Sequence, residues 1–132
     1  MRLRAKKYLL DIQAAADLIG SFTAGKNFTE YSNDPLLRSG VERQFEIIGE
    51  ALRKLFELDA RLAARIPEHR KIIAFRNVLI HGYATVDSRL VWGIVEGKLR
   101  DLRLRVKRLL EAGTAKASAP ARGPKVVRKA RT

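Results

Sequence analysis

The chain has 132 residues, a length typical of a single domain that can bury a hydrophobic core without cross-links. It contains no cysteine and two histidines, which excludes disulfides and thiolate metal sites and argues against a histidine-based zinc site. No apolar run is long enough to span a bilayer, and the basic, amphipathic start lacks the core of a signal peptide. We therefore expect a soluble, cytoplasmic protein that has no membrane contact, metal or cofactor.

The net charge of +13 is divided unevenly along the chain. Residues 1–115 hold 21 Lys and Arg against all 14 acidic residues, whereas residues 116–132 hold six Lys and Arg and no acid. A basic body followed by a basic tail favours a polyanionic partner, and nucleic acid is the commonest one. The alternative is a charge excess that only keeps the protein in solution.

Two helices are expected in the first half of the chain. Apolar residues three and four positions apart predict a helix over residues 4–22, followed by a polar loop over 24–34. Asp34 and the proline after it are typical of a helix start, because Asp caps free N–H groups and Pro fits the first turn. The second helix is predicted over residues 35–58, with residue 65 as its farthest alternative end.

Two more helices are expected in the second half. Pro67 is predicted to open a third helix over residues 67–81, which the following glycine caps. A fourth helix is predicted over 88–112, with Asp87 or Ser88 as its cap and Gly113 as its end. No segment alternates with a period of two over any length, so no strand is expected.

These patterns predict an all-α fold, most simply a four- to five-helix antiparallel bundle over residues 1–113. Residues 114–132 are Ala, Pro, Gly, Ser and basic residues, which cannot bury a core. We expect these residues to form a disordered basic tail.

The segment 72–83, IIAFRNVLIHGY, places a charge inside the most apolar stretch of the chain. We expect so apolar a segment to be a buried helix, and a charged residue is almost never buried unless something pairs with it. Arg76 therefore needs an ion-pair partner, a ligand or a water-filled cleft.

Arg76 and His81 together suit one kind of chemistry. Arginine offers a planar, permanently charged fork of donors for phosphate oxygens, and histidine gives or accepts a proton near neutral pH. Such a pair, without carboxylates or a metal, suits RNA cleavage in which the ribose 2′-OH attacks the adjacent phosphorus.

The spacing of these two residues sets a geometric condition. Five positions on a regular helix correspond to about 500°, or about 140° after one full turn, so Arg76 and His81 do not share a face. Either the helix loosens near Gly82 or a second subunit completes the site, and we expect both. A two-fold homodimer would bring two Arg–His pairs into one cleft.

Each residue also has a purely structural interpretation. Arg76 could form a buried salt bridge with Glu46 or Glu50 of the second helix. His81 could cap the helix C-terminus, and Tyr83 could be a packing residue with its hydroxyl at the surface.

At this motif the chain resembles a known family. RNVLIHGY matches the R-x4-H-x-Y signature of HEPN domains, and most closely that of the HepT-like toxins of HEPN/MNT toxin–antitoxin modules. The resemblance covers residues 6–110 and includes three further segments in the family's order: YLLDI at 8–12, FEIIGEALRKL at 45–55 and VWGIV at 91–95.

The resemblance implies a HEPN-like helical bundle that dimerises, so that two motifs form a composite ribonuclease cleft. By position, Arg76 and His81 would be the catalytic pair, with Asn77 supporting the site. Toxins of this kind act on cellular RNA, including tRNA for some members, and need no metal. Their activity is held in check by a cognate MNT-type nucleotidyltransferase antitoxin, which transfers AMP from ATP onto the motif tyrosine, here Tyr83.

Two other functions remain open at this point. The chain could be a non-catalytic HEPN adaptor subunit that docks a nucleotidyltransferase onto its substrate, although an adaptor has no chemical need for Arg76, His81 and Tyr83 together. It could also be a small basic protein that coats nucleic acid through the helix at 88–112 and the tail.

Overall fold

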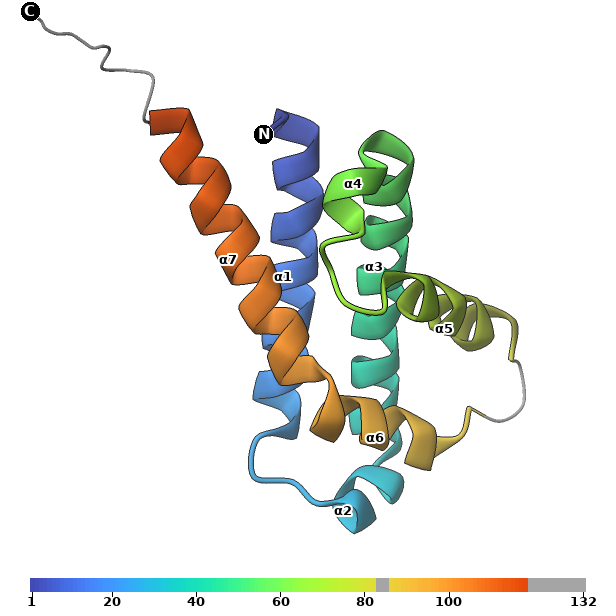
Figure 1. Cartoon of the computed structure of the whole chain (residues 1–132). Coiled ribbons are helices and arrows are strands. Elements are labelled where there is room, and N and C mark those ends of the chain that lie inside the picture. The colour runs from blue at the N-terminus through green and yellow to red at the C-terminus, as the bar shows by residue number, and fades with distance from the viewer. Residues whose placement is uncertain (83–85, 119–132) are drawn as a thin grey trace, which may run out of the picture.

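A computed structural model of the chain describes residues 1–82 and 86–118, with side chains up to residue 113. In these ranges the regular structure is entirely helical, which confirms the predicted all-α fold class. The helices are α1 (Leu3–Thr23), α2 (Phe28–Ser32), α3 (Pro35–Leu58), α4 (Ala60–Ala63), α5 (His69–His81), α6 (Ser88–Gly97) and α7 (Leu99–Ser118) (Figure 1).

Three long helices form the body of the molecule. Helix α1 packs against both α3 and α7 and runs antiparallel to each of them (Figure 1). Helix α5 crosses the outer side of α3, and α2 and α6 meet at the end of the bundle where α1 finishes. The predicted antiparallel bundle is therefore confirmed, with α5 as a helix attached to its side.

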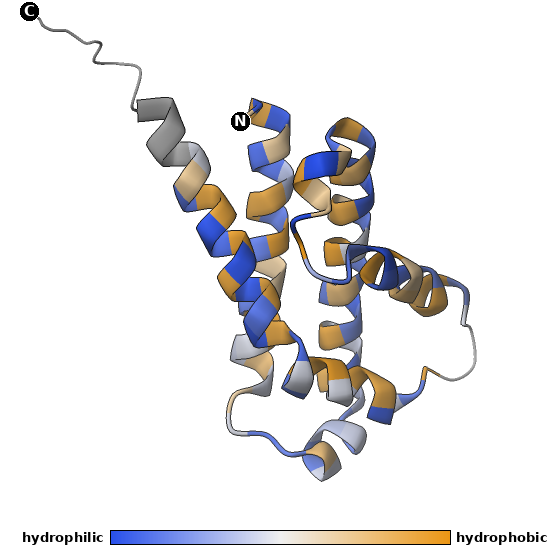
Figure 2. Cartoon of the chain, in the orientation of Figure 1, coloured by the Kyte–Doolittle hydropathy of each residue, from blue (hydrophilic) through white to orange (hydrophobic). Residues whose placement is uncertain are grey.

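The core lies between these helices. Apolar and polar residues alternate along α1 and α7, as expected for helices with one buried face (Figure 2). Burying a Leu or Ile side chain contributes about 1.5–3 kcal/mol. The fully buried side chains of the body include Leu9, Ile12, Ile19, Val41, Ile48, Leu52, Leu55 and Val106. None of the helices in the described part of the chain is long and apolar enough to cross a membrane.

Two helix starts follow the sequence signals. The side chain of Asp34 accepts a hydrogen bond from the backbone N–H of Leu37 at 3.0 Å, and that of Asp87 accepts one from Arg89 at 2.9 Å. A cap of this kind stabilises a helix by about 1 kcal/mol. The predicted starts at residues 35 and 88 are therefore confirmed.

The polar loop predicted over residues 24–34 contains a short helix instead, so that prediction is wrong for α2. Asn27 and Glu30 form a capping box, in which each side chain accepts a hydrogen bond from the other's backbone N–H, at 2.8 and 3.0 Å. The helix also gains from burial of Tyr31, whose ring lies 5.2 Å from that of Trp92.

The single helix predicted over 88–112 is also wrong at two points. It breaks at Lys98, which follows Gly97 and has φ −128°, and the break lets α6 pack on α2 while α7 packs on α1. Helix α7 then continues through Gly113, where we expected it to stop. Glycine lowers the stability of a helix but does not by itself end one. A Cβ built on Gly113 would lie 2.8 Å from the side-chain tip of Met1.

Residues 114–118, which were predicted to be the first part of the disordered tail, belong to α7 instead. The rest of the predicted disordered tail, residues 119–132, lies outside the described residues.

Helix α5 differs from the prediction in its start and in its burial. It begins at His69, after Glu68 adopts a left-handed conformation with φ 59°, instead of at residue 67. Leu79 is the buried residue of α5, whereas Val78 is 52% and Ile80 38% exposed. The expectation of a buried helix is therefore wrong, because one face of α5 packs on α3 and the rest stays open.

The contact between α3 and α5 depends on a glycine. A Cβ built on Gly49 of α3 would lie 2.3 Å from Cβ and 2.9 Å from Cγ of Arg76, closer than real side chains approach. Glycine in the middle of a helix costs about 1 kcal/mol relative to alanine, so its presence here reflects the close approach of α5.

We predict opposite effects for two Gly→Ala changes in α3. Gly49→Ala should lower the free energy of unfolding by about 1–3 kcal/mol, because α5 must move away from α3. Gly40→Ala, whose Cβ would meet the Phe22 ring at an ordinary 3.5 Å, should raise it by up to about 1 kcal/mol. Urea unfolding measures both, and equal effects of the two changes would contradict the close contact.

Candidate active site

Helix α5 carries three of the predicted site residues, Arg76, Asn77 and His81, and stays regular up to its end. The backbone N–H of Gly82 donates to the carbonyl of Val78 at 2.8 Å, as in an uninterrupted helix. The predicted cap at Gly82 is confirmed, but the predicted loosening of the helix ahead of it is wrong. The 140° separation of Arg76 and His81 therefore holds within one protomer.

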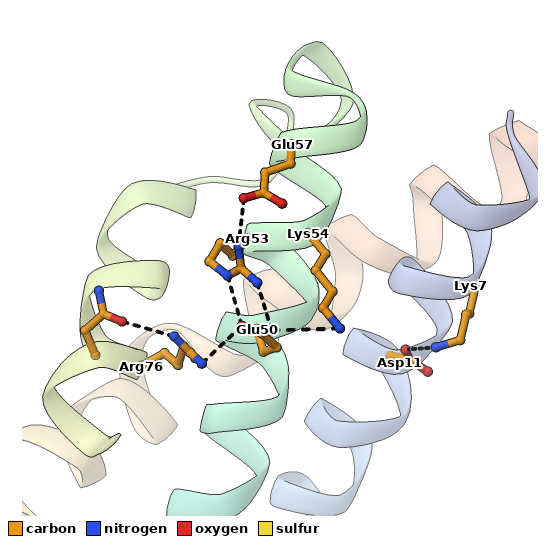
Figure 3. A network of polar contacts seen from close by, with 8 residues as sticks. Lys7, Asp11, Glu50, Arg53, Lys54, Glu57 and Arg76 are labelled. Atoms are coloured by element: carbon orange, nitrogen blue, oxygen red, sulfur yellow. Dashed lines mark hydrogen bonds and ion pairs between the residues drawn. The ribbon is translucent and has the colours of Figure 1, made fainter. Parts of the chain in front are cut away.

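Arg76 faces α3 and is held there by charge. Its Nη2 lies 3.2 Å from Oε1 of Glu50, and its Nη1 donates a hydrogen bond to Oδ1 of Asn77 at 3.2 Å (Figure 3). The side chain is 24% exposed, so it lies at the edge of the interior. The salt bridge to Glu50, one of the two partners that the sequence left open, is confirmed. The supporting role of Asn77 stays a prediction.

Glu50 is the centre of a network on the outer side of α3. Arg53 donates two hydrogen bonds to its carboxylate, at 3.0 and 2.9 Å, and Lys54 approaches it to 3.8 Å (Figure 3). The hydrogen bonds from Arg53, aided by the charges of Arg53, Arg76 and Lys54, lower the pKa of Glu50 although partial burial opposes them. Glu50 is therefore ionised at neutral pH and faces three cations.

Arg76 also lines a polar pocket between α1, α3 and α5. The pocket has a volume of about 250 Å³ and is lined by both signs of charge. Its lining cations are Lys7, Arg43, Lys54 and Arg76, and its lining acids are Asp11, Glu46 and Glu50. A pocket of this composition fits a charged, hydrogen-bonding ligand such as a phosphate group better than an apolar one.

His81 lies apart from this pocket, at the exposed C-terminal end of α5. One protomer therefore does not bring His81 and Arg76 onto one surface. Tyr83, the remaining residue of the motif, lies outside the described residues.

A second, apolar groove lies between α5, α6 and the start of α7. It has a volume of about 470 Å³, with Phe45 and Ile48 of α3 among its lining residues. Val78 of α5 and Leu90 of α6 stand at this groove and are 52% and 50% exposed. Exposed apolar surface of this kind is typical of a site that another molecule covers.

Sequence reasoning missed two features of this site. One is Gly49, whose signal was available, since a glycine in the interior of a long helix often marks a close approach. The other is the contribution of α1 to the pocket through Lys7 and Asp11, which no local pattern could have indicated.

These features define a helical bundle in which one helix carries the arginine and the histidine of the motif. Comparison with known proteins identifies its class. The family model described as "Ribonuclease HepT-like" matches residues 12–109, so the chain belongs to the HepT-like ribonuclease family. The family expected from the sequence is therefore confirmed.

Individual relatives cover most of the chain. A protein of Thermococcus cleftensis named "Probable ribonuclease HepT" is 35% identical over 109 residues, which are 83% of this chain and 98% of that protein. One of Methanocaldococcus jannaschii, "Putative RNase MJ1380", is 31% identical over 102 residues, or 77% of this chain and 93% of that protein. No solved structure matches the chain.

The network predicts a pH-dependent role for Glu50 in stability. Its pKa is lower in the folded protein, so its charge stabilises the fold above the unfolded pKa, and this is lost as the pH falls through the folded value. Glu50→Gln should lower the free energy of unfolding by about 1 kcal/mol at pH 7 and by progressively less below about pH 4. Urea unfolding at several pH values measures the difference.

Glu57→Gln is the matched control, because Glu57 pairs with Arg53 at 2.7 Å but does not contact Arg76. Its side chain is 64% exposed, so the change should cost less than Glu50→Gln. Equal losses would mean that the pair with Arg76 adds nothing to stability.

Proposed function

We propose that the chain is a metal-independent endoribonuclease and the toxin of a toxin–antitoxin pair. The observation that carries the proposal is the R-x4-H-x-Y motif at residues 76–83, which lies within the region matched by the HepT-like ribonuclease family. The names of the relatives, "Probable ribonuclease HepT" and "Putative RNase MJ1380", support the same activity. Cellular RNA is the substrate, and tRNA is a candidate within that class.

Cleavage follows from the chemistry of the two residues. His81 takes the proton of a ribose 2′-OH, and the 2′-oxygen attacks the adjacent phosphorus. Arg76 donates hydrogen bonds to the phosphate oxygens on which negative charge builds. The bond from phosphorus to the 5′-oxygen breaks and that oxygen takes up a proton, which leaves a 2′,3′-cyclic phosphate and a 5′-hydroxyl. DNA, which lacks the 2′-OH, is not cut.

The two residues work together across a two-fold homodimer. Within one protomer they lie about 140° apart around α5, so a copy of the chain must bring an arginine beside a histidine. The open face of α5 and the apolar groove beside it support this arrangement, because a second protomer would cover Val78 and Leu90.

The salt bridge to Glu50 is compatible with a catalytic role for Arg76. It holds the guanidinium at the wall of the polar pocket before RNA arrives, which reduces the entropy lost when a phosphate binds. Asn77 adds a second contact that fixes the same group. Arg76 would then serve both the stability of the fold and the reaction.

We predict that His81→Ala abolishes cleavage of RNA in the presence of EDTA while the helical content and unfolding midpoint stay near those of the wild type. His81 is exposed, so its removal leaves the core intact. The products of the wild type should end in 2′,3′-cyclic phosphate. His69→Ala is the matched control, because the chain's other histidine stacks on Phe56, 5.6 Å between rings, and should remain active.

Mixing two inactive variants tests the shared cleft. A mixed dimer, with Arg76→Ala in one protomer and His81→Ala in the other, has one of its two Arg–His pairs intact if each pair is formed across the interface. Because about half of the dimers in an equal mixture are mixed, about a quarter of the wild-type activity should return. A mixture that stays inactive would place both residues of a pair in one protomer. Full cleavage by the double variant Arg76→Ala/His81→Ala would refute the site altogether.

The proposed regulation acts on Tyr83. A cognate MNT-type nucleotidyltransferase would transfer AMP from ATP onto its hydroxyl, with loss of pyrophosphate. The product carries a bulky, negatively charged group two residues from His81, which would repel the RNA backbone and occupy the cleft.

Tyr83→Phe should keep ribonuclease activity but escape modification, because phenylalanine has no hydroxyl to accept AMP. Intact mass spectrometry after incubation with the transferase and ATP measures the added AMP. Tyr8→Phe is the control and should be modified like the wild type. Addition of AMP to the Tyr83→Phe protein would identify a different acceptor.

A further inference from the structure

The start of α1 and the last turns of α7 lie at the same end of the bundle. Figure 1 shows the N-terminus beside the end of α7, as the antiparallel packing of these helices requires. Residues 1 and 113 are in contact range, since a Cβ on Gly113 would lie 2.8 Å from the tip of Met1. Residues more than 100 positions apart in the sequence therefore form one surface.

This surface is strongly basic. It presents five exposed Lys and Arg side chains, which we call the basic end: Arg2, Arg4, Lys6, Lys107 and Arg108. Among the described residues none of the five forms an ion pair, and the residues outside the described ranges contain no Asp or Glu. Glu111 is the one acid between residues 102 and 118.

The acids nearest along neighbouring helices are already engaged. Asp11 pairs with Lys7 at 2.8 Å and Asp17 with Arg103 at 2.9 Å, both on the α1 side. At the end of α3, Glu57 pairs with Arg53, and Asp59 caps α4 through the N–H of Leu62. The positive charge of the basic end is therefore not neutralised from these helices.

The basic end is continuous with the pocket that holds Arg76. Lys7, next to Lys6 on α1, lines that pocket together with Arg76. Arg4 lies one turn before Lys7 on the same face of α1, about 4.5 Å along the axis. The first turns of α1 therefore connect the basic end with this pocket.

The sequence that follows α7 extends the same charge. Residues 119–132, which follow α7 in the sequence, contain five Lys and Arg and no acid.

We propose that the basic end binds the phosphate backbone of the RNA substrate and delivers it to the pocket of Arg76, outside the residues that cut. The proposal rests on the proposed function, since it assigns the docking surface of that enzyme. An anionic membrane is the other partner that such charges could attract, but the continuity with the Arg76 pocket favours RNA.

Two double variants of the full-length chain test this proposal. Lys6→Gln/Arg108→Gln removes one Lys and one Arg from the basic end. Lys26→Gln/Arg100→Gln removes the same charges near the opposite ends of the same two helices. Binding is measured over a range of salt with a single-stranded RNA bearing 2′-O-methyl groups, which cannot be cleaved, so the result does not depend on catalytic activity.

The basic-end variant should weaken binding and reduce the slope of log K against log salt by about 1.4, or about 0.7 for each lost phosphate contact. The control variant should leave the slope unchanged. With cleavable RNA, the basic-end variant should raise KM and leave kcat unchanged. A chain that binds the methylated RNA in this way but does not cut RNA would overturn the proposed function and keep the docking surface.

Equal slopes of log K against log salt for the two variants would overturn the proposed docking surface. Binding would then depend on the total charge of the protein and not on the position of the charges. A fall in kcat without a change in KM would overturn it as well. Vesicles with and without anionic lipid provide the last arm. Binding to anionic vesicles that the basic-end variant loses, with RNA binding unchanged, would assign the surface to a membrane.

Discussion

The close contact of α5 with α3 is the constraint on which the candidate site depends. Gly49 lets the backbone of α5 approach until the base of the Arg76 side chain fills the space above it. The next residue, Glu50, then meets the guanidinium at 3.2 Å. Two adjacent residues of α3 thus set both the depth and the direction of Arg76. Both residues are needed to hold Arg76 at the edge of the interior, since an ion pair without the close approach of the helices would leave Arg76 in open solvent.

The sequence predicted the fold where the signals are local. Asp34 and Asp87 cap helices because a carboxylate beside free N–H groups needs no tertiary partner. The short helix with Tyr31 was missed although Asn27 and Glu30 have the spacing of a capping box, because so short a helix also depends on burial of Tyr31 against Trp92, about 60 positions away. The break at Lys98 was missed because an apolar stripe of helical period continues across it, and what bends the chain there is the packing of α2 and α1 on either side.

The site was predicted in part for a similar reason. Arg76 and its alternative partner Glu50 could be named from the apolar segment around the arginine and the acids of the preceding helix. The exposure of α5 could not be predicted. The hydropathy of a segment indicates that its burial would be favourable, but it does not show whether the rest of the chain buries it. The same limit explains why Lys7 was not associated with Arg76, as only the packing of α1 beside α3 places it there.

The separation of Arg76 and His81 around a regular helix would have a consequence for dosage in the proposed dimer. A cleft assembled from two protomers would make cleavage depend on the square of the protomer concentration wherever dimers are scarce. A cell that holds a few copies of the protein would then suffer less than proportionate damage, and damage would rise more steeply than synthesis. In the proposed dimer, the geometry of one helix would set the steepness of that response.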